Sequence, residues 1–181
     1  MATLISGSTG VNKITDGTIT NADIASGAAI AGTKLVMPTG SVLQVVEASS
    51  NTGFATSATT YQSTGSSVTI TPTDSASKIL LMLNTNAWMS GTSGYAQMKI
   101  VAAGGVTGTV AEWGDWMYSA SESAFVQMAQ FQKAHTGHNT TSAITYTAWI
   151  KSLNGATLWF PNDYLNNTND KSMFMAIEIA G

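Results

Sequence analysis

Residues 143–151, AITYTAWIK, carry the clearest secondary-structure signal in the sequence. Ile144, Tyr146, Ala148 and Ile150 fall on every second position, and mostly polar residues lie between them. Side chains of a β-strand point to opposite faces in turn, so this alternation predicts a strand with one buried and one wet face. We expect this strand to lie on the outer sheet of a β-sandwich.

Similar short strands recur on both sides of this segment, with clusters of Gly, Asn, Ser and Thr between them. A series of short strands separated by turn residues is typical of an antiparallel sandwich or barrel, so we predict an all-β fold. The predicted strands are Ser41–Glu47, Thr59–Ser63, Ser67–Thr71, Lys78–Asn84, Tyr95–Val101, Thr109–Trp113, Ala124–Lys133, Ala143–Lys151, Thr157–Phe160 and Ser172–Ile179.

Two of the predicted strands contain stretches that are apolar without alternation. These are Ile79–Leu83 (ILLML) and Met173–Ile179 (MFMAIEI). A strand that is apolar on both faces is normally covered on both faces. We therefore expect the sandwich core to cover one face of each strand, and another subunit or layer to cover the other.

The first 37 residues have a different pattern. In residues 13–35, KITDGTITNADIASGAAIAGTKL, large apolar residues recur every five or six positions, which is neither the helical period of 3.6 nor the strand period of two. Glycines and turn-forming Asp and Asn residues fill the intervals. The pattern predicts a short repeat in which each unit contributes one buried side chain. The recurring residues are Ile14, Ile19, Ile24, Ile30 and Leu35.

This repeat cannot fold as a single chain. Burying five Ile or Leu side chains yields about 10–15 kcal/mol, whereas ordering some two dozen backbone residues costs about 1–2 kcal/mol each. Three intertwined copies would add interchain hydrogen bonds and bury the apolar row completely. We therefore predict an extended, intertwined trimeric stalk over residues 1–37 and a head over residues 38–181. The alternative is a flexible leader that folds only on a partner.

The composition excludes several classes of partner. Charged residues make up 9% of the chain, against about 25% in ordinary soluble domains, and the formal net charge is −3. All seven basic residues are scattered lysines, which disfavours binding to nucleic acid. There is no cysteine, and we expect neither a signal peptide nor a membrane span because no apolar run is long enough.

Two stretches of the sequence resemble bacteriophage proteins. Residues 14–35, ITDGTITNADIASGAAIAGTKL, resemble a repeat found near the start of many tail-fibre and virion structural proteins. Residues 37–48, MPTGSVLQVVEA, and 59–85, TTYQSTGSSVTITPTDSASKILLMLNT, resemble the opening of the small β-sandwich heads that often follow it. Together these stretches lie in the first half of the chain.

The resemblance implies a homotrimeric virion protein with a jelly-roll-like head, exposed on the exterior of the phage particle. As a short tail fibre or spike, it would attach by its N-terminus to other virion proteins of the tail or baseplate, and its head would contact the host surface. The main alternative is a capsid decoration or head-fibre protein, because 181 residues is short for a tail fibre. A third alternative, from another class, is a carbohydrate-binding or carbohydrate-cleaving module.

The most unusual local stretch of the head is residues 112–118, EWGDWMY. Aromatic faces stack on the apolar faces of sugar rings, and carboxylates accept hydrogen bonds from sugar hydroxyls. Trp113, Asp115, Trp116 and Tyr118 are therefore candidate contacts to a host surface glycan. The alternative is that these aromatic residues fill the core or a subunit interface. A glycosidase needs two carboxylates at a defined separation, and nothing in the sequence fixes such a separation between Glu112 and Asp115. These residues are therefore not predicted to be a catalytic pair.

The chain has two histidines, His135 and His138, three residues apart beside a glycine. Imidazole is a good metal ligand, and a threefold axis would multiply the ligands, whereas the alternative is an exposed polar hairpin tip that could also contact a receptor. We favour the tip. No phosphate-binding loop, zinc spacing or nucleophile elbow occurs in the sequence. We therefore predict that the protein is not an enzyme and binds neither cofactor nor metal.

Overall fold

The computed structural model describes residues 37–90, 94–119, 125–161 and 171–181. The predicted stalk lies outside these ranges apart from Met37, and so do its five recurring apolar residues. The described residues contain ten β-strands and no helix, which confirms the predicted all-β fold. The strands are β1 (Val42–Ser50), β2 (Phe54–Thr56), β3 (Gln62–Ile70), β4 (Lys78–Met89), β5 (Gly94–Gly104), β6 (Gly108–Ser119), β7 (Phe125–His135), β8 (Ile144–Ser152), β9 (Leu158–Phe160) and β10 (Ser172–Ile179).

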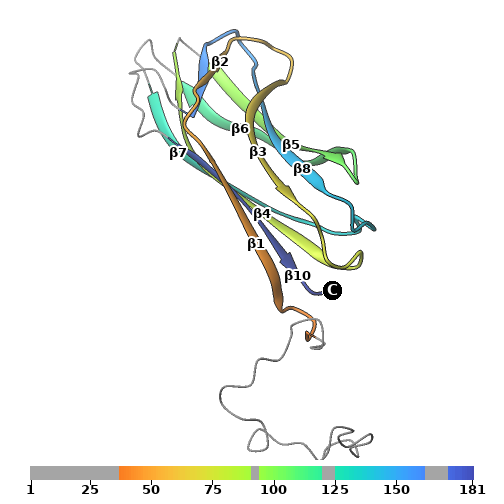
Figure 1. Ribbon diagram of the computed structural model, residues 1–181. Coiled ribbons are helices and arrows are strands. Elements are labelled where there is room, and N and C mark those ends of the chain that lie inside the picture. Colours follow the sequence, from red (N-terminus) through yellow and green to blue (C-terminus); the bar gives the residue numbers. More distant parts are fainter. Residues whose placement is uncertain (1–36, 91–93, 120–124, 162–170) are drawn as a thin grey trace, which may run out of the picture. The chain divides into compact units, whose positions relative to one another are not determined.

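The strands form two antiparallel sheets that face each other as two layers (Figure 1). One sheet has the order β1-β10-β4, with β7 on the other side of β4 and the short strands β9 and β2 beyond the end of β10. The other has the order β3-β8-β5-β6. The predicted antiparallel β-sandwich is therefore confirmed. The long strands pair as a nested series, β1 with β10, β3 with β8, β4 with β7 and β5 with β6, which is a jelly-roll arrangement.

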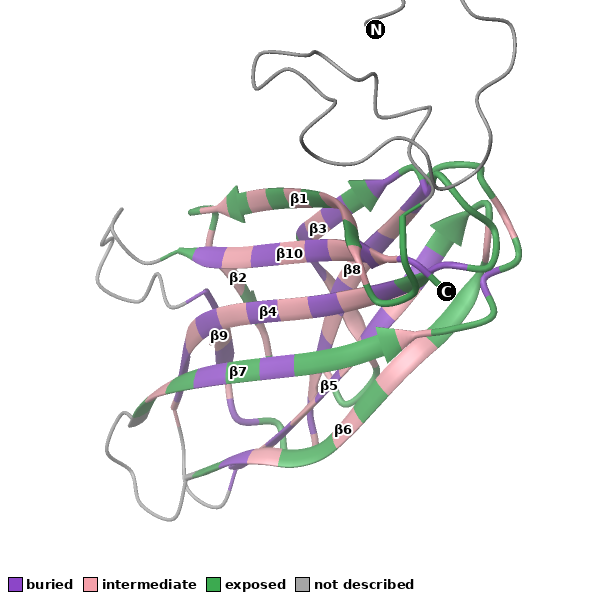
Figure 2. Ribbon diagram, turned by 90° about the horizontal axis from the view of Figure 1, so that it is seen from below, coloured by how far each residue is buried: buried purple, intermediate pink, exposed green. Residues whose placement is uncertain are grey.

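The core lies between the two sheets and is formed by every second residue of the long strands. Ile144, Tyr146, Ala148 and Ile150 of β8 are all 0% exposed, which confirms the buried face predicted from their alternation. On the facing sheet, alternate residues of β4 and β10 are likewise buried, as the banding of these strands in Figure 2 shows. The remaining residues of the two strands point away from the core.

Several strands differ from the prediction. Strand β4 continues to Met89 and β6 to Ser119, beyond the predicted ends at Asn84 and Trp113. Residues 62–70 form one strand, although glycine and polar residues had predicted a break between Ser63 and Ser67. A bulge accommodates these residues: Gly65 has a φ of 77°, and the hydroxyl of Thr64 donates a hydrogen bond of 2.9 Å to the carbonyl of Ala148. Strand β2 was missed because it is only three residues long.

Two buried serines of the core provide a matched test of how hydroxyl groups are satisfied. Ser152 and Ser172 are both 0% exposed. The Ser172 hydroxyl lies 2.6 Å from that of Ser66, whereas the Ser152 hydroxyl has no hydrogen-bond partner among the described residues. Ser152→Ala should therefore raise the free energy of unfolding by about 1 kcal/mol, and Ser172→Ala should lower it by about 1 kcal/mol. Urea unfolding measures both changes, and changes of the same sign would contradict this assignment.

Candidate functional site

The predicted aromatic platform at residues 112–118 is divided between two faces of its sheet. Strand β6 has an irregularity between Trp113 and Met117, opposite a single residue of β5. As a result Trp113 and Trp116 both pack against the core, with ring centroids 5.1 and 5.2 Å from that of Phe131. For the two tryptophans this is the alternative that the sequence offered, in which the aromatic residues fill the core. The extra residues of β6 re-aim its side chains, so the spacing alone did not show which of them would turn inward.

The other two residues of the platform lie at the surface. Asp115 is exposed, and its carboxylate accepts a hydrogen bond of 2.9 Å from the side-chain amide of Gln97. Tyr118 is 48% exposed and lies beside Tyr95, with 4.8 Å between ring centroids. The structure therefore does not bring all four predicted contacts together on one face.

The two histidines lie close together, with 6.1 Å between ring centroids, but the expected exposed tip is wrong for His138. That side chain is 2% exposed, and its ring nitrogens lie 3.2 Å from the Ser77 hydroxyl and 3.0 Å from the carbonyl oxygen of Thr140. The ring of His135 lies 2.8 Å from the hydroxyl of Tyr146, and burial, together with the charge of His138, lowers the pKa of His135. No group of three or more metal-ligating side chains occurs among the residues that the structure describes.

A buried carboxylate, Glu178, was not predicted as a site. It lies on the inner face of β10 and is 0% exposed. Burial raises its pKa, but hydrogen bonds to the carboxylate outweigh that effect and leave the pKa lowered. The donors are the Gln44 amide at 2.6 Å, the Thr73 amide and hydroxyl at 2.8 and 3.1 Å, the Asp74 amide at 3.1 Å and the Ser77 hydroxyl at 2.8 Å.

A second unpredicted group lies on the outer face of the β3-β8-β5-β6 sheet, and we call it the lysine–aromatic cluster. It consists of Tyr61, Lys99, Trp149 and Lys151. Each lysine ammonium lies 4.5 Å from the centroid of the Tyr61 ring, and that of Lys99 also lies 5.7 Å from the Trp149 ring. The alternation in residues 143–151 placed Trp149 and Lys151 on a wet face, but nothing in the sequence indicated their approach to Tyr61.

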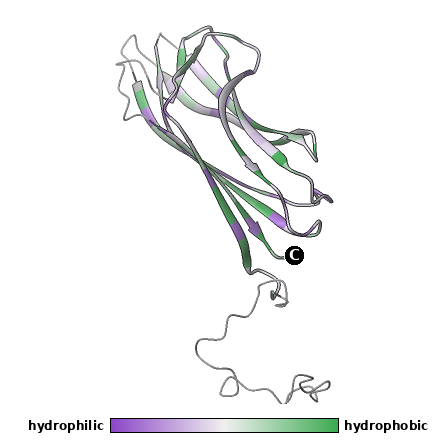
Figure 3. Ribbon diagram, viewed as in Figure 1, coloured by the Kyte–Doolittle hydropathy of each residue, from purple (hydrophilic) through white to green (hydrophobic). Residues whose placement is uncertain are grey.

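The outer face of the β1-β10-β4-β7 sheet carries the largest number of half-buried and exposed apolar residues. Val42 and Val45 are each 55% exposed, and Met128 is 83% exposed. Ile177 of β10 pairs with Val45 on one side and with Leu80 on the other, so these apolar residues lie side by side across three strands. Figure 3 shows hydrophobic residues along the strands of this sheet. We call this surface the apolar outer face. Its members are Val42, Val45, Leu80, Met82, Met173, Met175, Ile177 and Ile179. Glu47 and Lys78 lie on its border, and Asn84, Asn86 and Gln130 separate it from Val126 and Met128.

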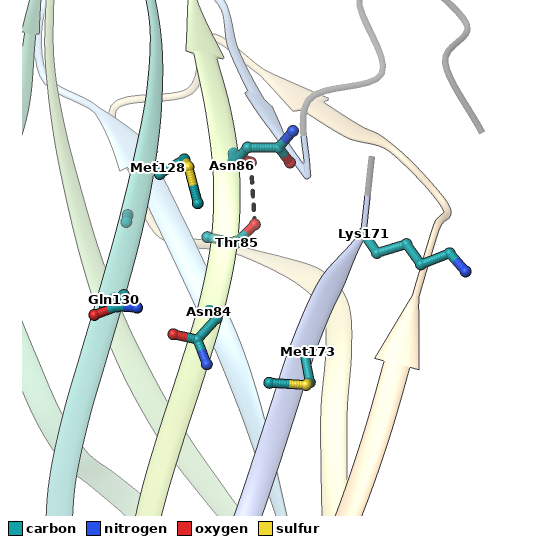
Figure 4. Close-up of a pocket in the computed structure, with 8 residues that line it drawn as sticks. Asn84, Thr85, Asn86, Met128, Gln130, Lys171 and Met173 are labelled. Carbon is teal, nitrogen blue, oxygen red and sulfur yellow. Dashed lines mark hydrogen bonds between the residues drawn. The ribbon is translucent and has the colours of Figure 1, made fainter. Parts of the chain in front are cut away.

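The same sheet is hollowed beside the apolar outer face. A pocket of about 520 Å³ lies over β4 and β7 and is lined by amide and methionine side chains (Figure 4). It reaches Met173 of β10 and the neighbouring Lys171. Its residues are Asn84, Thr85, Asn86, Met128, Ala129, Gln130, Lys171 and Met173. The pocket therefore combines apolar side chains with hydrogen-bonding ones.

No family model matches this sequence, and no curated protein matches it. Among solved structures, the chain is similar to a subviral particle of the infectious bursal disease virus protein VP2, with 12% identity and a TM-score of 0.43. This match covers 84% of the chain and 42% of VP2. A structure of the Gx strain of that virus matches with 11% identity and a TM-score of 0.41, over 85% of this chain and 41% of the other.

This chain therefore spans less than half the length of the viral chains that it matches. At these identities the likeness concerns the arrangement of strands. In the part of the chain that the structure describes, no helix has the length and apolar character of a membrane span.

Proposed function

We propose that the protein is a structural component of a bacteriophage particle, a short homotrimeric tail fibre or spike on the virion exterior. Residues 1–37 attach it to other virion proteins of the tail or baseplate, and the jelly-roll head presents a surface to the host. The protein acts by assembly and binding, and it has no enzymatic activity. The observation that carries this proposal is the apolar outer face, which a solitary head would leave in water.

The apolar outer face has the properties of an assembly surface. Large contiguous apolar patches are uncommon on monomeric proteins and mark interaction sites. Here the patch lies on regular strands, so its side chains are held in fixed positions before any partner binds. The same strands contain the two stretches, Ile79–Leu83 and Met173–Ile179, whose apolar character, interrupted only by Glu178, predicted cover on both faces. Cover by two further copies of the head satisfies that prediction.

The phage context rests on the resemblance of residues 14–35 and 37–48 to the fibre repeat and the heads that follow it. A capsid decoration or head-fibre protein is the alternative function, because it would use the same trimeric head at a different place on the particle. The apolar outer face is compatible with either position, so the distinction needs an experiment on intact particles.

Antibodies raised against residues 38–181 should label the tail or baseplate of intact phage particles in electron micrographs. This result is expected because the proposed stalk fixes the head to the tail apparatus. Antibodies that have been absorbed with the purified head serve as the control. Labelling spread over the capsid would favour the decoration protein, and the absence of label on any particle would contradict a place on the virion exterior.

A further inference from the structure

We infer that the lysine–aromatic cluster binds an acidic oligosaccharide, a sugar chain that carries carboxylate groups. The inference names the ligand class of the proposed host contact, and it depends on the proposed function only for the biological source of the sugar. It differs from the expectation that residues 113–118 form the binding platform, because Trp113 and Trp116 pack against the core.

The cluster gathers positive charge in a chain that has little of it. Two of the seven lysines, Lys99 and Lys151, share the ring of Tyr61 although the net charge of the chain is −3. Each ammonium lies 4.5 Å from the centroid of that ring, so the two charges are no farther apart than twice that distance. The ring attracts both ammonium groups, but they repel each other. A bound anion that contacts both lysines would relieve this repulsion.

The aromatic ring between the lysines is held in place. The hydroxyl of Tyr61 donates a hydrogen bond of 2.7 Å to the carboxylate of Glu112, which lies on β6 directly opposite Lys99. Burial, and then the hydrogen bond to Glu112 and its charge, raise the pKa of Tyr61, so the hydroxyl keeps its proton at neutral pH. The bond to Glu112 therefore fixes the position of the ring that the two lysines share.

The mixture of side chains fits a sugar better than other anions. The ring of Trp149 offers a flat face for the apolar side of a sugar ring, and Glu112 and the Gln97–Asp115 pair can exchange hydrogen bonds with hydroxyl groups. A nucleic acid would need a larger set of clustered cations than these two lysines. An acidic sugar needs one or two cations and many hydroxyl contacts.

Calorimetric titration of the full-length protein tests this inference. The ligands are oligogalacturonate and oligoalginate, each compared with its neutral ester, so that the members of each pair differ in charge but share a backbone. At least one acidic chain should bind about tenfold more tightly than its ester, because charge-assisted hydrogen bonds to ammonium groups are lost on esterification. A 20-bp DNA duplex serves as a general polyanion.

Single substitutions locate the site. Lys99→Ala and Lys151→Ala should each weaken binding of the acidic chain about tenfold, whereas Lys99→Arg should retain most of it. Lys133→Ala is the matched control, because this exposed lysine lies on β7 of the other sheet and its loss removes the same charge. Tyr61→Ala should reduce discrimination between acid and ester, because it removes the ring that holds the two ammonium groups together.

Three results would overturn the inference. The first is that both sugars fail to distinguish acid from ester, either because acid and ester bind equally or because neither binds. The second is an effect of Lys133→Ala on binding as large as that of Lys151→Ala. The third is that the DNA duplex binds as tightly as the sugars. Light scattering on the same samples gives the oligomeric state independently. A trimer that fails to distinguish acid from ester would refute this inference and leave the proposed assembly intact.

Discussion

Glu178→Ala should lower the free energy of unfolding by about 3–5 kcal/mol at neutral pH, because each buried donor left without an acceptor costs about 1–3 kcal/mol. The carboxylate accepts hydrogen bonds from two backbone amides, two hydroxyls and one side-chain amide. Alanine supplies none of these acceptors. Urea unfolding at a fixed protein concentration measures the change, since assembly also affects stability.

Asp115→Ala is the matched control, because it removes the same charge from an exposed position that has one hydrogen bond, to Gln97. Its effect should stay within about 0.5 kcal/mol. Glu178→Gln should have an intermediate effect, because the amide oxygen still accepts hydrogen bonds while its NH₂ group faces donors. Equal losses for Glu178→Ala and Asp115→Ala would show that the network does not stabilise the head.

The Glu178 carboxylate also makes the stability of the head depend on pH. The folded-state pKa of Glu178 lies below its ordinary value of 4.5. A carboxyl group of this kind contributes stability that is fully present above the ordinary pKa and is lost as the pH falls through the folded pKa. Below pH 4.5 the unaltered protein should therefore lose stability more steeply than Glu178→Gln does, and parallel curves would contradict this role for the carboxylate.

Ile177→Lys should convert the protein from a trimer into a monomer. The unaltered protein should show three times the chain mass of 18.8 kDa in light scattering at micromolar concentration, and the variant should show the mass of one chain. Ile177 lies between Val45 and Leu80 on the apolar outer face. Burying an uncharged polar group without a hydrogen-bond partner costs about 2–7 kcal/mol. A buried ammonium group without a partner costs more, and each subunit of the trimer would bear this cost.

The variant should still fold, because the Ile177 side chain points away from the core and is partly exposed. Circular dichroism of the β-sheet signal checks this point. Thr147→Lys is the control: Thr147 has the same intermediate exposure but lies on the opposite sheet, so this variant should remain trimeric. A monomeric unaltered protein, or a trimeric Ile177→Lys variant, would contradict the proposed interface.

The sequence predicted the sandwich well because strand alternation is a local property. Residues 143–151 showed their buried face directly, and Ser172–Ile179 were predicted with the observed bounds. The site was harder to predict because its residues meet only after the sheets pair. Tyr61 and Lys151 are far apart in the sequence, and the irregularity in β6 that turned Trp116 towards the core depends on its pairing with β5.

Glu178 shows the same difficulty for a single residue. In the stretch MFMAIEI it looks like a charge that interrupts an apolar strand and would be expected at the surface. Its burial depends on donors from Gln44 and from residues 73–77, which reach it only in the folded head. Pattern alone cannot show that a charged residue will be satisfied in this way.

The position of β10 between β1 and β4 also determines when the head can be completed during its synthesis on the ribosome. Ser50 of β1 and Ser172 of β10 are 122 residues apart, which corresponds to roughly 6–25 s of translation at ordinary rates. Strand β10 also supplies Met173, Met175 and Ile177 of the apolar outer face. The surface proposed for trimer formation is therefore incomplete until β10 has been synthesised, and subunits would meet only after each has inserted that strand between β1 and β4.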